Sequence, residues 1–269
     1  MNTLIFGNGF IGSRLHGAIP STMSTKRIHS IADAMAEIDR YQADVVINCI
    51  GFTGYTSVDD CEVDRPRTIY ANTFIPIILN EATKRTGTKL VHISSGCIYN
   101  YTPGSPPITE DLKPDFFDLY YSRTKIYAEG ALDDSVLSLR LRIPLDNRPH
   151  PRNLLTKLLA FNKVIDIPNS ITYIPDFIDA LQHLLIIDAK GIFNLTNTGG
   201  LRYPDLLYTY NRYKEHKFHT MTLDELGRVR TNIILSTEKL RNSGFTIRNI
   251  NNVLDECVRG YLQEGGPDV

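Results

Sequence analysis

The sequence predicts an α/β fold in which a doubly wound parallel sheet is accompanied by a small C-terminal subdomain. Short apolar runs that suit buried strands alternate with longer segments of helical periodicity along most of the chain. The first apolar run, Thr3–Phe6, leads directly into a glycine-rich turn and then a helical pattern. With 269 residues, 42% of them hydrophobic, the chain is long enough to bury a substantial core.

The later elements follow in a regular order. Ser30–Asp33 resembles a capping box, and Ile31, Met35 and Ile38 then share one helical face. We expect, in chain order, a strand over Asp44–Ile50, a helix over Asp64–Arg85 stopped by Gly87, a strand over Lys89–Ser94, a loop over Tyr99–Leu119, a helix over Tyr121–Leu132, a strand over Ser135–Ile143, a helix over Asn153–Phe161, helix starts at Pro175 and Pro204, and a late strand over Gly191–Thr196.

Composition excludes several classes of function. Lys plus Arg number 29 and Asp plus Glu 30, so a net charge of -1 gives no argument for binding nucleic acid or an anionic membrane. The four cysteines and seven histidines lack metal-ligand spacing, so no metal is expected. Free thiols, no apolar run of ~18 residues and no secretion signal together predict a soluble cytoplasmic protein.

A GxGxxG motif follows the first strand and opens a helix. It consists of Gly7, Asn8, Gly9, Phe10, Ile11 and Gly12. Gly7 allows the tight turn, Gly9 lets the backbone approach a pyrophosphate, and Gly12 lets helix and strand pack closely. Because the motif stands between a strand and a helix, it predicts a Rossmann-type dinucleotide site rather than an ordinary turn. We therefore expect residues 1–150 to bind the dinucleotide and 151–269 to form mainly a substrate-binding subdomain, with 172–197 returning to the first domain.

The stretch after this unit favours NADPH over NADH. NAD sites usually carry an acidic residue ~20 residues after the glycines, whereas NADP sites offer arginine. Here Lys26 and Arg27 stand in a stretch without an acid, and both are candidate contacts of the 2′-phosphate. NADH remains the alternative, since each cation could equally be a solvated surface residue.

Tyr121 and Lys125 form a YxxxK pair on one face of the predicted helix. A nearby ammonium favours the phenolate, so such a tyrosine can exchange a proton with a carbonyl or alcohol oxygen. Together with the glycine motif, the pair resembles the extended branch of the short-chain dehydrogenase/reductases. That resemblance implies a third catalytic residue at Ser95, further cofactor contacts from Tyr121 and Lys125, and a turn beside the cofactor that includes Asn48 and Gly51.

Further segments carry a closer resemblance: Gly51–Gly54, Val58–Glu62, Pro151–Asn153, Asn162–Val164 and Ile167–Ser170. Together they resemble the nucleotide-rhamnose synthase epimerase-reductases, which are related to dTDP-4-dehydrorhamnose reductase. The family implies 3,5-epimerisation of UDP-4-keto-6-deoxyglucose followed by NADPH-dependent reduction at C4, giving UDP-L-rhamnose. It also implies a separate 4,6-dehydratase that supplies the substrate.

The same resemblance implies Cys97 as the epimerase base and Lys157 as the matching acid. If the strand continues through Cys97, the side chains of Ser95 and Cys97 point to the same face. Thr53, Arg152, Asn153 and Asn169 are candidate substrate contacts, and arginine matches phosphate geometry best. Tyr173 and Asp176 either close the substrate domain or serve only packing and capping.

Two other functions stay open from the residues alone. A simple dTDP-4-dehydrorhamnose reductase would not need Cys97 and Lys157. A non-catalytic NADP-binding regulatory subunit would not need an intact Ser95, Tyr121 and Lys125. The superfamily often pairs through two long helices, here Asp64–Arg85 and Tyr121–Leu132, so a homodimer is a further expectation.

Overall fold

The computed structural model describes residues 1–265, which form two compact units. The first unit comprises residues 1–98, 113–140 and 188–193, and the second comprises 99–112, 141–187 and 194 onward. Both are built from segments distant in sequence, because the chain leaves the first unit after Ile98 and returns to it twice. Each unit is described by itself.

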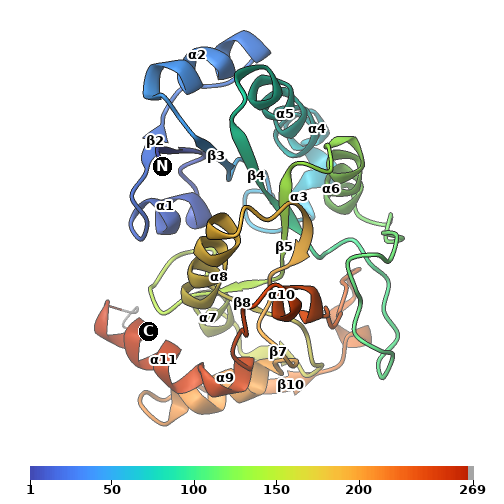
Figure 1. The fold of residues 1–269 in the computed structure, drawn as a ribbon. Helices are drawn as coiled ribbons and strands as arrows, with labels where there is room; N and C mark the ends of the chain where they lie inside the picture. The colour runs from blue at the N-terminus through green and yellow to red at the C-terminus, as the bar shows by residue number, and fades with distance from the viewer. Residues whose placement is uncertain (266–269) are drawn as a thin grey trace. The chain divides into compact units, whose positions relative to one another are not determined.

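The first unit contains a six-stranded sheet (Figure 1). Its strands are β1 (Thr3–Phe6), β2 (Thr22–Ser24), β3 (Val45–Asn48), β4 (Lys89–Ser95), β5 (Leu137–Leu141) and β9 (Gly191–Asn194), in the spatial order β2-β1-β3-β4-β5-β9. β1 pairs in parallel with β2 on one side and β3 on the other, and β3 pairs in parallel with β4. The order reverses between β1 and β3, and such a switch point is where open α/β sheets bind ligands.

Helices connect these strands. They are α1 (Phe10–His16), α2 (Ile31–Tyr41), α3 (Asp60–Val63), α4 (Arg65–Ile69), a π-helical segment η1 (Tyr70–Phe74), α5 (Ile75–Thr86) and α6 (Tyr120–Ala131). Ser30 caps α2 by accepting a hydrogen bond from the Asp33 N–H, which confirms the predicted cap. α5 ends at Gly87 in a left-handed conformation, as the stop signal predicts. Leu4, Val46 and Leu79 belong to the buried cluster beneath α2 and α5.

The second unit has its own core and two small parallel sheets, β6 (Pro144–Leu145) with β8 (Thr172–Tyr173), and β7 (Lys163–Ile165) with β10 (His219–Met221). Its helices are α7 (Leu154–Leu159), α8 (Ile174–Ile186), α9 (Tyr203–Asn211), η2 (Asp224–Leu226), α10 (Glu238–Asn242), η3 (Ile250–Asn252) and α11 (Leu254–Gln263). α9 and α11 pack together (Figure 1). Leu206, Tyr210 and Tyr261 are buried in the same cluster as Leu155.

The sequence predictions of fold class and of the main elements are confirmed. Pro175 and Pro204 lie in the first turns of α8 and α9, and the helix predicted to end at Arg85 runs through α4, η1 and α5. Three-residue strands such as β2 are absent from the predictions, because their short polar sequences have no strand periodicity. The strand predicted over Lys89–Ser94 is β4, which ends at Ser95. It does not continue to Cys97, so the condition for a shared strand face is not met and Cys97 lies in the turn that follows.

Candidate active site

The glycine motif forms a tight turn at the carboxyl end of β1. Gly7 has a φ of 100°, and a Cβ on it would lie 2.7 Å from the Cys49 carbonyl carbon. A Cβ on Gly12 would lie 1.8 Å from the Gly7 oxygen, so neither glycine tolerates a side chain. Gly9 differs, since nothing lies within 4 Å of its Cβ position and the residue is exposed. The turn therefore offers backbone that an external group can approach closely.

The remaining members of the motif continue this turn into α1. The Asn8 carbonyl accepts a hydrogen bond from the Ser13 hydroxyl at 2.9 Å. Phe10 is buried and Ile11 partly buried, so they fix the helix against the sheet. No side chain caps α1, which begins after Gly9. In dinucleotide sites, a helix that begins directly after such a glycine turn points its N-terminus at the anion.

The two cations predicted to select the cofactor lie just after β2, whose carboxyl end neighbours that of β1. Lys26 forms an ion pair with Asp33 at 3.3 Å. Arg27 is exposed, and its side chain makes no ion pair with any residue in the range 1–265. Arg27 is therefore better suited than Lys26 to accept a phosphate.

Asn48 is fully buried and shapes the turn after β3. Its Oδ1 accepts a hydrogen bond from Ile50 N at 3.0 Å, and its Nδ2 lies 3.1 Å from His92 Nδ1 on the neighbouring strand. The side chain thus holds the backbone of the turn rather than facing a ligand itself. Gly51, three residues later, is exposed, and a Cβ there would lie 3.7 Å from Lys125 Nζ. The turn and the predicted catalytic lysine are therefore adjacent.

Ser95 and Cys97 are held together by the turn that ends β4. Cys97 N donates a hydrogen bond to Ser95 Oγ at 3.1 Å. The Cys97 carbonyl accepts a hydrogen bond from Ser122 Oγ at 2.5 Å, which ties this turn to the first turn of α6. Cys97 also packs against the cluster that contains Tyr121, Phe52 and Cys61. The thiol and the phenol predicted to be catalytic therefore belong to one group of contacting side chains.

Lys125 lies one helical turn after Tyr121 and is almost completely buried. Its Nζ donates a hydrogen bond to the Ile93 carbonyl at 3.3 Å. Burial lowers the pKa of Lys125 from its ordinary value of 10.5 to about 8, opposed first by the carboxylate of Glu129 and then by Cys49 and Cys97. Burial raises the pKa of the Cys49 thiol to about 12, so Cys49 stays protonated at neutral pH. Perturbed groups of this kind are typical of functional sites.

Sequence reasoning missed Asn72, which joins several parts of this site. It lies in the π-helical segment η1, and such segments are frequent at functional sites. Its Oδ1 accepts a hydrogen bond from Phe52 N at 2.8 Å, and its Nδ2 donates to Phe52 O at 2.9 Å and Thr124 Oγ1 at 3.3 Å. Asn72 therefore fixes the Gly51–Phe52 backbone to α6. Thr53, the next residue, is exposed.

In the second unit, Asn153 caps α7. It is fully buried, its Oδ1 accepts from Leu155 N at 3.2 Å, and its Nδ2 donates to the carbonyls of Asp146 and Arg148. A direct contact with substrate would require the side chain to leave this cap. Arg152 precedes it and is partly exposed.

Lys157 lies on α7 and is exposed. Desolvation lowers the pKa of its ammonium, and repulsion from Arg152 adds to the effect. A lysine whose ammonium is destabilised in this way is a better proton donor than an ordinary surface lysine.

Asn169 is also buried in a complete set of hydrogen bonds. Its Oδ1 accepts from Arg142 Nε at 3.1 Å and from Ile233 N at 3.2 Å, while its Nδ2 donates to Asn232 Oδ1 at 3.0 Å. Asn169 therefore connects the segment before β8 with the chain around Ile233. This role leaves little of its side chain for a ligand.

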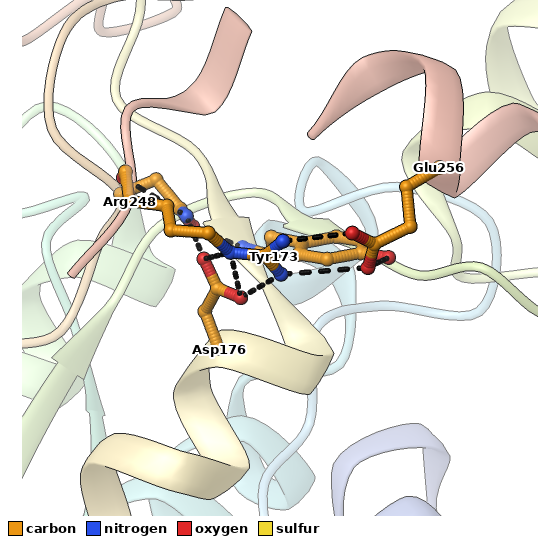
Figure 2. Close-up of polar contacts among 5 residues, drawn as sticks. Tyr173, Asp176, Arg248 and Glu256 are labelled. Atoms are coloured by element: carbon orange, nitrogen blue, oxygen red, sulfur yellow. Dashed lines mark hydrogen bonds and ion pairs between the residues drawn. The ribbon is translucent and has the colours of Figure 1, made fainter. Parts of the chain in front are cut away.

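A closed polar network surrounds Tyr173 and Asp176 at the start of α8. Figure 2 shows Arg248 lying between two carboxylates. Its Nε is 3.0 Å from Asp176 Oδ1, and its Nη1 is 2.7 Å from Glu256 Oε2. The Tyr173 hydroxyl donates to Glu256 Oε1 at 3.0 Å. Of the two roles open to Tyr173 and Asp176, this network supports packing, since it joins the start of α8 to α11 and to the segment that precedes η3.

The described residues contain neither a candidate metal site nor a membrane-spanning helix. Within residues 1–265, no group of three histidine, cysteine, aspartate or glutamate side chains could hold a metal ion. No helix in that range is long and apolar enough to cross a membrane. The four cysteines are all free thiols.

The parallel sheet, its switch-point turn and the Tyr121–Lys125 pair define a short-chain dehydrogenase/reductase. The chain belongs to the RmlD substrate binding domain family, which residues 1–160 match. This confirms the family resemblance inferred from the motifs.

Known relatives share one area of chemistry. The chain is 31% identical over 260 residues to a bifunctional dTDP-4-dehydrorhamnose 3,5-epimerase/dTDP-4-dehydrorhamnose reductase from Arabidopsis thaliana, covering 89% of this chain and 86% of that protein. It is 32% identical over 213 residues to a trifunctional UDP-glucose 4,6-dehydratase/UDP-4-keto-6-deoxy-D-glucose 3,5-epimerase/UDP-4-keto-L-rhamnose-reductase of the same plant, covering 76% of this chain but 32% of that protein. The chain thus spans about a third of the length of the trifunctional relative.

A solved structure matches nearly the whole chain. The UDP-rhamnose synthase of Acanthamoeba polyphaga mimivirus superposes with a TM-score of 0.89 at 25% identity, covering 97% of this chain and 99% of that one. The likeness therefore extends beyond the first 160 residues and includes the segments that form the second unit.

Proposed function

We propose that the protein is a bifunctional 3,5-epimerase and NADPH-dependent 4-keto reductase that converts UDP-4-keto-6-deoxyglucose into UDP-L-rhamnose. The observation that carries this proposal is the contact of Cys97 with the cluster of Tyr121, at a turn fixed to α6 by the Ser122 hydrogen bond. A reductase alone has no use for a thiol beside its tyrosine. The names of the plant and viral relatives support the same reading.

The residues present fit a nicotinamide dinucleotide. In our proposal the first unit is the cofactor-binding domain, and its glycine turn faces the pyrophosphate, where Gly9 leaves open space. Arg27, assisted by Lys26, contacts the 2′-phosphate, which favours NADPH and leaves NADH as the weaker alternative. The Asn48–Gly51 turn, Tyr121 and Lys125 border the nicotinamide end. The cofactor, when bound, supplies the hydride for reduction at C4.

Epimerisation uses the acidity of the protons that flank the C4 ketone. Cys97, as thiolate, removes the proton from C5 or C3, and the electron pair moves onto the C4 oxygen as an enolate. Hydrogen bonds from Ser95 and Tyr121 stabilise that oxygen. Lys157 then returns a proton to the opposite face of the carbon, which inverts its configuration.

Reduction uses the same hydrogen bonds to the C4 oxygen. As hydride reaches C4, the Tyr121 hydroxyl gives its proton to the developing alkoxide. The neighbouring Lys125 ammonium stabilises the resulting phenolate. One pair of donors thus serves both reactions, because each reaction develops negative charge on the same oxygen.

The second unit is proposed as the substrate-binding domain. Arg152 is proposed to contact the nucleotide sugar. Asn153 and Asn169 act on the substrate through the loops that they hold, because both side chains are buried in hydrogen bonds. Thr53, in the first unit, is a separate proposed substrate contact.

The biological setting follows from the substrate. A 4,6-dehydratase must supply the 4-keto sugar, and the trifunctional relative carries that activity in its name. Four free thiols suit a cytoplasmic enzyme. We further propose a homodimer through the face that includes Val63, Phe74 and Tyr127, which are large apolar side chains left exposed on α3, η1 and α6.

The test is to incubate the protein with enzymatically generated UDP-4-keto-6-deoxyglucose and NADPH in D₂O. NADPH absorbance reports reduction, and NMR identifies the product and the deuterium at C3 and C5. Cys97→Ala should still reduce the ketone but should form no rhamnose and lose deuterium incorporation. Cys61→Ala is the matched control, because it removes a buried thiol of the same cluster.

Other outcomes would favour the two competing functions. Reduction without deuterium incorporation by the parent protein would indicate a simple reductase, and dTDP-4-keto-6-deoxy sugars would then be compared. Tight NADPH binding without oxidation on either nucleotide sugar would indicate a regulatory subunit.

A further inference from the structure

A buried ion pair lies behind the catalytic helix, within the first unit. Glu129 and Arg140 are 6% and 1% exposed, and Arg140 Nε lies 3.1 Å and 3.0 Å from the two carboxylate oxygens. The Arg140 Nη2 also bonds this carboxylate. Charges buried this deeply are costly unless paired, and a pair of this kind is often no more stabilising than apolar residues. Stability alone therefore does not account for a buried ion pair at this position.

The position of Glu129 on α6 suggests that role. It lies four residues after Lys125 and eight after Tyr121, so all three side chains share one face of the helix. Ser94 Oγ donates to Glu129 Oε2 at 3.1 Å, and Ser94 directly precedes Ser95 at the end of β4. The carboxylate is thus held from two neighbouring strands, β4 and β5.

We infer that Glu129, held in place by Arg140, is a positioning residue that favours the charged form of the buried Lys125 side chain, and that the Arg140 guanidinium opposes this effect. Glu129 favours the ammonium electrostatically, and Arg140 both orients Glu129 and offsets most of its charge. Without Glu129 the buried lysine would release its proton more easily. Without Arg140 the carboxylate would hold that proton more tightly.

Other groups around Lys125 do not replace this carboxylate. The groups that face Lys125 from its own helix and from the turns and strands against it are Tyr121, Glu129, Cys49, Cys97 and His92. Of these, Glu129 makes the largest favourable contribution to the ammonium, and Arg140 is hydrogen-bonded to its carboxylate. His92 is fully buried, and desolvation holds its pKa well below the ordinary value, so it adds no charge at neutral pH.

The test measures NADPH affinity against pH by nicotinamide fluorescence, together with the pH profile of 4-keto reduction. The inference rests on the proposed function only for the second readout. The parent should lose affinity as the pH rises through about 8, the pKa of Lys125. Glu129→Gln should move this loss to lower pH by roughly one unit, and Arg140→Gln should move it to higher pH, as expected for a unit charge one helical turn away in a partly screened interior.

The double variant Glu129→Gln/Arg140→Gln removes both charges and should return the midpoint to near the parent value. The midpoint is compared only over the pH range in which each variant is folded, so partial loss of stability does not mask the result. Asp133→Asn is the control, because it removes a carboxylate paired with Lys84 in the same unit.

Two results would overturn the inference. One is an unchanged midpoint in Glu129→Gln, and the other is a shift in the same direction for both single variants. If only the double variant folds, its midpoint of NADPH affinity should still lie near that of the parent. A displacement by a full pH unit would show that the charges of Glu129 and Arg140 do not offset each other at Lys125. Failure of the proposed function would appear differently, as normal pH-dependent NADPH binding without reduction of any 4-keto sugar.

Discussion

Replacing Gly9 with alanine should weaken dinucleotide binding while leaving the fold of the glycine turn intact. At Gly9 the backbone has φ −75° and ψ −169°, which alanine adopts readily, and no atom lies within 4 Å of the new Cβ. The unliganded protein should therefore be unchanged or more stable by about 0.4–1 kcal/mol, because alanine restricts the unfolded chain. The open space at this position is, in our proposal, the space of the pyrophosphate, so the added methyl group should block its approach.

The size of the effect follows from ligand linkage. NADPH at a hundred times its dissociation constant should stabilise the parent by ~2.7 kcal/mol. For a chain of this size that corresponds to an increase in Tm of about 5–10 °C. If Gly9→Ala weakens binding about a hundredfold, the gain at the same concentration falls to ~0.4 kcal/mol, an increase in Tm of about 1 °C.

The assay is thermal unfolding with and without NADPH, checked by direct fluorescence titration. Gly130→Ala is the matched control, because this exposed glycine of α6 also has nothing within 4 Å of its Cβ position. It should raise stability and keep the full NADPH shift. A Gly9→Ala protein that is stable and still shows the full shift would refute the assignment of the glycine turn to the dinucleotide.

Two further predictions concern stability. Asp176→Ala should lower Tm by about 4–8 °C, because it removes about 2 kcal/mol of charged hydrogen bonding from Arg248. The value of kcat/KM at low temperature should stay near that of the parent, and Asp179→Ala on the exposed face of α8 is the control. A stable but inactive Asp176 variant would instead indicate that Asp176 binds the substrate. His92, with its lowered pKa, stays neutral when folded but protonates when unfolded, so stability should fall by up to ~1.4 kcal/mol per pH unit below about pH 6.5. Urea titrations of His92→Gln should show a shallower fall, and an identical slope would contradict this account.

The sequence predicts best those parts of the site where no other residue type would fit the local geometry or supply the same chemistry. Gly7 and Gly12 occupy positions where a Cβ would meet backbone atoms, so their spacing carries geometric information. Tyr121 and Lys125 are similar, because a four-residue step on a helix brings their side chains together. The glycine motif also predicts the fold class, since it must stand at a strand–helix junction.

Buried residues that support the site through hydrogen bonds are not marked by any comparable sequence motif. Asn72 and His92 are buried polar residues in stretches that otherwise predict an ordinary helix and an ordinary strand. Their partners, Phe52 and Asn48, come from separate parts of the chain. A single sequence does not reveal such pairs, because neither residue has a spacing that requires the other.

The end of β4 shows how a local detail changes a mechanistic argument. The prediction that Ser95 and Cys97 share a strand face depended on a continued strand, whereas the strand stops at Ser95. Their association is instead produced by the turn, in which Cys97 N bonds Ser95 Oγ and Ser122 bonds the Cys97 carbonyl. Because Ser122 directly follows Tyr121 on α6, a single hydrogen bond couples the proposed epimerase thiol to the reductase tyrosine. A change at Ser122 should therefore disturb epimerisation and reduction together, which substitution of Cys97 alone should not do.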